Sequence, residues 1–155
     1  MPIREILIFQ RQLFYTNQGY VAYTNRTGTN QTWSTPETIR IQAISTGSPG
    51  LCAIVNVDII ETIRVYYGGS QNGIQELGYM FTDDQWGEYA FWTEGDVKSG
   101  IGCTTKIVDG SISAIIYFRD STNGTLRKYS WDYGNTTGDP ENYEWPAGML
   151  CERDT

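Results

Sequence analysis

The sequence predicts an all-β protein, specifically a β-propeller of four-stranded blades with about three blades per chain. One observation is composition: 17 Gly, 11 Tyr and 5 Trp among 155 residues are typical of short strands joined by tight turns rather than of a helical protein. The other observation is a repeat of about 50 residues. Four short strands in each repeat of this length are typical of a propeller blade. An ordinary β-sandwich with coincidental spacing is the alternative.

The repeat is marked by cysteines and by turn residues. Cys52, Cys103 and Cys151 are separated by 51 and 48 residues, and the Asn-Gly dipeptide at 72–73 returns at 123–124. Because the cysteine count is odd and equivalent positions of a repeat are expected to lie apart, the sequence favours small, buried, reduced cysteines over a disulfide.

Three degenerate copies of one unit are expected to form a single domain over the whole chain. Their approximate bounds are residues 1–50, 51–102 and 103–155. Three blades do not close a ring and would leave sheet faces uncovered. A homodimer of 3 + 3 blades with two-fold symmetry is therefore the expected assembly.

The strands of the middle unit follow from its apolar and aromatic runs. A first strand is expected at Cys52–Val57, a hairpin from Ile63–Tyr67 and Ile74–Met80, and a fourth strand at Trp86–Trp92. The glycine-rich stretch between the two hairpin strands supplies the turn.

This hairpin carries one arginine and one glutamate. If a five-residue loop begins at Gly68, Arg64 pairs directly with Glu76 on one face of the sheet. At an exposed position such an ion pair contributes under ~1 kcal/mol. The alternative is that the two side chains bind a sugar. A guanidinium only donates hydrogen bonds and a carboxylate only accepts them, so together they can bind the hydroxyl groups of a monosaccharide.

Composition also bears on the class of function. A formal net charge of −7 without a basic run gives no source for the counterion release that drives nucleic-acid binding, and no segment approaches the ~18 apolar residues that span a bilayer. The sequence contains no histidine, which excludes His-based triads and most zinc sites, so neither a metal nor a cofactor is expected. The N-terminus does not read as a signal peptide, which favours a cytoplasmic or non-classically secreted protein unless a signal was removed.

Acidic residues offer little basis for an enzyme. Asp83 with Asp84, or Glu94 with Asp96, could be nominated as paired carboxylates, but turn acids in a Gly- and Thr-rich stretch are the favoured interpretation. A glycosidase needs two carboxylates ~5 to 10 Å apart in a pocket, and Glu76 has no evident acidic partner. A non-enzymatic protein is expected.

Residues 50 to 146 resemble the fungal fucose-specific lectins of the Aleuria type and their short bacterial relatives, which are six-bladed propellers. The resemblance rests on IRVYY, on an acidic residue twelve positions after its arginine, and on the aromatic residues that follow. It implies a sugar site between the second and third units. Arg64 and Glu76 match the lectins' charged pair, and Trp131 and Trp145 match the aromatic residues contributed by the next blade.

Only the middle unit retains both charges. The equivalent positions hold Ile115 and Lys128 in the third unit, and Gln12 and Ala22 in the first. At most one intact site per chain is therefore expected.

Tyr79 and Trp86 would line an altered second pocket against the first unit, but a role as core or rim aromatics is favoured over binding. By resemblance, the expected function is a lectin for L-fucose or fucosylated glycans. A non-catalytic protein-interaction or structural propeller that has lost sugar binding is the alternative function.

Overall fold

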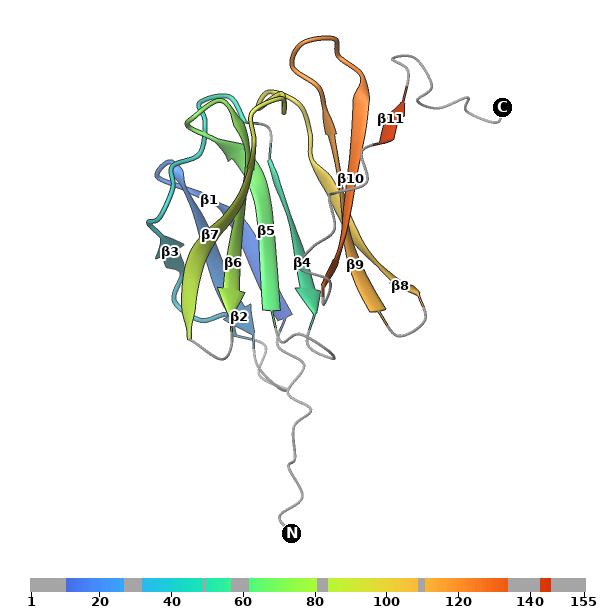
Figure 1. Ribbon diagram of the computed structural model, residues 1–155. Helices are drawn as coiled ribbons and strands as arrows, with labels where there is room; N and C mark the ends of the chain where they lie inside the picture. Colours follow the sequence, from blue (N-terminus) through green and yellow to red (C-terminus); the bar gives the residue numbers. More distant parts are fainter. Residues whose placement is uncertain are drawn as a thin grey trace, which may run out of the picture.

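A computed structural model describes residues 11–26, 32–48, 50–56, 62–80, 84–108, 111–133 and 143–145. Within them the chain forms three small antiparallel sheets and no helix (Figure 1), which confirms the all-β class. The first sheet contains β1 (Arg11–Asn17), β2 (Tyr20–Arg26) and β3 (Glu37–Ile39). The second contains β4 (Leu51–Asn56), β5 (Thr62–Gly69), β6 (Gly73–Met80) and β7 (Gln85–Trp92), and the third contains β8 (Gly102–Val108), β9 (Ser111–Arg119), β10 (Leu126–Tyr133) and β11 (Tyr143–Trp145).

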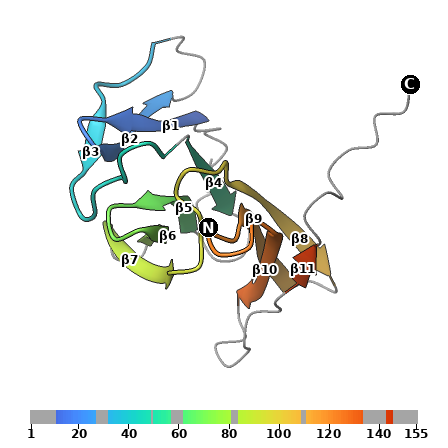
Figure 2. The same ribbon diagram turned by 90° about the horizontal axis from the view of Figure 1, so that it is seen from above.

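Each sheet is an open meander in which neighbouring strands follow one another along the chain. Seen from above, the second sheet lies between the first and the third (Figure 2). The described strands do not join into a closed barrel, and none of the described residues belongs to a helix long and apolar enough to cross a bilayer.

Both faces of the second sheet are covered, because its strands alternate side chains between two apolar clusters. The cluster shared with the first sheet includes Val21, Ile39, Val65 and Leu77. The cluster shared with the third sheet includes Tyr66, Ile74, Ile116 and Phe118. The central strands therefore contribute to the core from both sides.

The β5–β6 hairpin differs from the predicted register. Gly69 pairs with Gly73, so the loop contains three residues rather than five, and Arg64 pairs with Gly78. The predicted direct pairing of Arg64 with Glu76 is therefore wrong. Because the register differs by two residues and side chains alternate with a period of two, the two charges nevertheless remain on the same face.

The shorter loop depends on the backbone of one residue. Asn72 has a φ of 60°, a left-handed conformation that asparagine tolerates better than most residues. Its amide donates to the Gly69 carbonyl at 3.1 Å. A three-residue hairpin loop commonly ends on a residue in this conformation.

The segment that leads into the second sheet and the segment that leads into the third are held by the same contacts, 51 residues apart; each set of contacts is called a joint. Ile44, before β4, forms a β-bridge with Gly69, and Gly95, before β8, forms one with Asp120. Ile44 and Gly95 are 51 residues apart, and so are Gly69 and Asp120. The amides that donate the flanking backbone hydrogen bonds repeat in the same way: Ser45 and Ser70 in one joint, Asp96 and Ser121 in the other.

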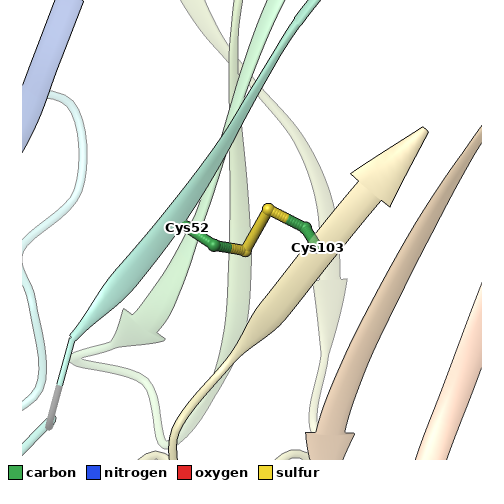
Figure 3. The surroundings of a disulfide bond; sticks show 2 residues. All are labelled: Cys52 and Cys103. Carbon is green, nitrogen blue, oxygen red and sulfur yellow. A yellow bond between two sulfur atoms is a disulfide. The ribbon is translucent and has the colours of Figure 1, made fainter.

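Cys52 of β4 and Cys103 of β8 form a disulfide between the second and third sheets (Figure 3), with their Cα atoms 5.9 Å apart. The expectation that these cysteines lie apart and remain reduced is therefore wrong. The physical reason is that the first strands of successive sheets are neighbours, β1 beside β4 and β4 beside β8. Cys151 lies outside the described residues.

Candidate ligand-binding site

Arg64 of β5 and Glu76 of β6 form a buried ion pair. Nη1 of Arg64 lies 3.2 Å from Oε1 of Glu76, and the two side chains are only 9% and 4% exposed. The pair spans a diagonal of the hairpin rather than a direct cross-strand position. The sequence suggested an exposed ion pair, but the pair that forms is buried. The cost of removing both charges from water therefore dominates the energy of this pair.

The pair lies on the face of the second sheet that is directed toward the third. Tyr66 and Ile74 are each two residues from one member of the pair, and both belong to the apolar cluster shared with the third sheet. Side chains two residues apart in a strand share a face. This is the side on which a site between the second and third units was expected.

Tyr89 of β7 covers the guanidinium, and sequence reasoning missed it. Its ring centroid lies 3.7 Å from Cζ of Arg64, within the range of a cation–π contact. The pairing of β6 with β7 shifts register between Gln75 and Leu77, so that two β7 residues, Tyr89 among them, lie opposite Glu76. Such a bulge re-aims side chains, and nothing in the run QWGEYAFW marks where it falls.

Gly78 provides the space for this arrangement. It pairs with Arg64 across the hairpin, and a Cβ at this position would meet Nη1 of Arg64 at 2.5 Å and Cε2 of Tyr89 at 2.6 Å. The guanidinium and the phenol ring therefore both lie directly against the backbone of Gly78. A side chain there would displace at least one of them.

Burial raises the pKa of Glu76 to about 7, although the neighbouring Arg64 guanidinium lowers it through its charge and its hydrogen bond. Removing a carboxylate from water costs more than one partner returns. Near neutral pH the group therefore exchanges between a carboxylate that only accepts hydrogen bonds and an acid that can donate one.

The resemblance to the lectins assigned Trp131 and Trp145 as the aromatic residues of the sugar site, and the structure shows where both lie in their strands. Trp131 pairs with Ala114 in the third sheet, and Trp145 of β11 pairs with Leu126. Their side chains lie outside what the structure describes. Whether they stand beside Arg64 therefore stays a prediction.

Tyr79 and Trp86 do face the first sheet, where they pack against other rings. Trp86 lies 5.4 Å from Tyr79, 5.7 Å from Tyr23 and 6.1 Å from Phe14 between ring centroids. The hydroxyl of Tyr23 donates to Glu37 at 2.7 Å. These four rings form an aromatic cluster at the junction of the first and second sheets.

The acidic residues nominated as catalytic pairs take part in local hydrogen bonds. Glu94 accepts a hydrogen bond from the hydroxyl of Tyr129, Asp84 accepts one from Tyr79, and Asp96 accepts one from a backbone amide at 2.9 Å. Asp83 lies outside the described residues. Within the described part of the chain, no group of three or more Cys, Asp or Glu residues is placed to hold a metal ion.

A second, partly buried ion pair closes the β9–β10 loop. Oδ2 of Asp120 lies 2.5 Å from Nη2 of Arg127, and Oδ1 accepts the amides of Thr122 at 2.7 Å and Asn123 at 3.2 Å. Burial raises the pKa of Asp120, but these hydrogen bonds and the charge of Arg127 outweigh it and lower the pKa overall. Because both of its oxygens already accept hydrogen bonds, this carboxylate closes the loop and is not available to bind a ligand.

Comparisons with known proteins identify no relative. No protein-family model matches the chain, and neither does any curated protein or solved structure. The fold and the site define an all-β protein in which the described residues form three antiparallel sheets, with a buried arginine–glutamate pair on the face between two of them.

Proposed function

We propose that the protein is a carbohydrate-binding protein that recognises L-fucose or fucosylated glycans through Arg64 and Glu76. The observation that carries the proposal is an arginine–glutamate pair on the face of the second sheet directed toward the third. The guanidinium can donate to vicinal sugar hydroxyls while the carboxylate accepts from them. Aromatic side chains suit the C–H face and the methyl group of a 6-deoxy sugar.

The third sheet would supply the second wall of this site. Tyr129 belongs to the apolar cluster between the second and third sheets, and Trp131 follows it by two residues in β10. This register makes Trp131 the first candidate for the stacking residue that the lectin resemblance implies. Trp145 is the second candidate.

A glycan array and calorimetry with L-fucose test the proposal. Arg64→Ala and Glu76→Ala are each expected to weaken binding at least about tenfold, because each leaves the other charge and the sugar hydroxyls without a partner. Arg119→Ala, which removes an exposed arginine of β9, is the matched control and is expected to bind as the wild type does. A wild-type protein that binds no fucosylated glycan would contradict the proposal.

A protein-interaction or structural role is the second candidate, and one observation favours it. The ion pair is almost closed to solvent, as a purely structural pair would be. In that case Arg64→Ala would lower the free energy of unfolding, and the array would show no glycan bound by the wild type.

We further propose that the three sheets are blades of half a β-propeller and that two copies complete a six-bladed ring. The first strands of successive sheets lie side by side, and the later strands of each sheet follow in order away from them. Blades around a propeller axis follow the same order, and this similarity supports the proposal. Light scattering after size-exclusion chromatography is expected to give twice the chain mass of 17.5 kDa, whereas a clean monomer would contradict the dimeric ring.

A further inference from the structure

We infer that Tyr89 is a movable cover over the Arg64–Glu76 pair, and that a ligand reaches the pair only when the ring swings away. The nature of the ligand, a sugar with vicinal hydroxyls, rests on the proposed function. The cover itself is a property of the free chain and is tested without a ligand.

The first step is that the pair is closed in the free protein. Arg64 and Glu76 are nearly buried, whereas Tyr89, which stacks on the guanidinium, is 49% exposed. The phenol ring thus lies between the charged pair and water. Because the two side chains are only 9% and 4% exposed with the ring in place, a sugar hydroxyl cannot reach the in-plane N–H donors of Arg64 or the carboxylate of Glu76 in this state.

The second step is that the Tyr89 ring lies against glycine backbone and is half exposed. Gly78 and Gly87 pair with each other across β6 and β7, and the Tyr89 ring lies over both. A Cβ would stand 2.6 Å from the ring at Gly78 and 3.6 Å from it at Gly87. Part of the ring thus contacts backbone that carries no side chain, and 49% of Tyr89 remains exposed. Rotation about its side-chain bonds carries it into solvent.

The third step concerns the effect on binding. If only the open form binds, the apparent affinity is lowered by the fraction of molecules that are open. A partly desolvated cation–π contact favours the closed form by about tenfold. Tyr89→Ala is therefore expected to raise the association rate and affinity for L-fucose by about that factor. Tyr89→Phe keeps the ring and is expected to behave like the wild type.

Chemical modification of arginine tests the cover directly. Phenylglyoxal is applied to the folded full chain, and the modification of each arginine is followed by peptide mass spectrometry. Arg64 is expected to react at least about tenfold more slowly than the exposed Arg119 in the wild type and in Tyr89→Phe, but at a similar rate in Tyr89→Ala. Because Tyr20 stacks on Arg40 at 5.6 Å, Tyr20→Ala is the matched control and should change the reactivity of Arg40 alone.

The outcomes separate this inference from the proposed function. Slow modification of Arg64 in folded Tyr89→Ala, or fast modification in the wild type, would overturn the cover. Equal fucose association rates for the wild type and Tyr89→Ala would also overturn it. If Tyr89→Ala exposes Arg64 but neither protein binds fucose, the cover stands and the sugar-binding function fails.

Discussion

At the scale of single residues, Glu76 differs most from its behaviour in water. Burial raises its pKa from 4.5 to about 7, although the Arg64 guanidinium opposes the shift. In the unfolded chain the same carboxyl regains its ordinary pKa. Protonation of this one group is therefore coupled to folding.

The free energy of unfolding is expected to fall as pH rises from about 4.5 to about 7. In this window the folded chain keeps the Glu76 proton and the unfolded chain has lost it, so the stabilisation is complete below the lower pKa and is lost as pH passes the upper one. A rise from 4.5 to about 7 corresponds to a loss of free energy of unfolding on the order of 3 kcal/mol. Urea unfolding at a series of pH values measures it.

Glu76→Gln is the control for this pH dependence. The variant has no titrating group at position 76. The difference in free energy of unfolding between the wild type and the variant should therefore change with pH between 4.5 and about 7. A variant that retains the full wild-type pH dependence would show that other groups cause it.

Sequence reasoning reached the two charges of the site but not their surroundings. The predicted register of the hairpin was wrong by two residues, yet it still placed Arg64 and Glu76 on one face. Side chains alternate between the faces of a sheet, so a register error of an even number of residues leaves each side chain on its face. The ring that covers Arg64 belongs to Tyr89, which lies at a bulge in another strand. That contact depends on tertiary geometry, which a pattern along the chain does not encode.

At the scale of elements, the connection from β7 to β8 is pressed tightly onto the core. Gly95 bridges to Asp120, and a Cβ on Gly95 would lie 2.2 Å from Cγ1 and 3.2 Å from Cβ of Ile74. Ile74 is fully buried in the cluster between the second and third sheets. The joint therefore needs a residue without a side chain.

Gly95→Ala is expected to lower the free energy of unfolding by about 1 to 3 kcal/mol, because the added methyl group overpacks against Ile74. Gly100→Ala is the matched control in the same connection, since a Cβ there meets nothing within 4 Å. It is expected to be nearly neutral. Chemical denaturation of both variants checks the prediction, and equal losses in the two would contradict it.

The four strands expected in the middle unit are present, while the loop between its hairpin strands is shorter than expected. Apolar runs suffice to find strands because they extend over several residues. The three-residue loop requires a left-handed backbone at Asn72. Details that depend on one backbone angle are the ones that sequence patterns do not determine.

At the scale of the whole molecule, the Cys52–Cys103 disulfide ties the second sheet to the third across a sequence separation of 51 residues. The regular cysteine spacing was visible in the sequence. Spacing along the chain does not reveal that first strands of successive sheets converge, so the pairing was missed. The bridge now makes the stability of two sheets interdependent.

Replacing both Cys52 and Cys103 by Ser is expected to lower the free energy of unfolding by up to about 4 kcal/mol, the loop-closure value for a 51-residue separation. Guanidinium denaturation of the oxidised wild type and the double variant measures the loss. Cys151→Ser controls for the general effect of a Cys-to-Ser change. An unchanged midpoint in the double variant would contradict the prediction.

Because the joints on its two sides are alike, the second sheet is a unit that could be duplicated within the chain. Its two joints use bridges and amide donors at the same 51-residue offset, so a segment that begins just before β4 and ends just before β8 carries matching connectors at both ends. Inserting a second copy of that segment would extend the chain by one sheet without requiring a new type of junction. The extended chain would carry a second copy of Arg64, Glu76 and Tyr89 in tandem with the first.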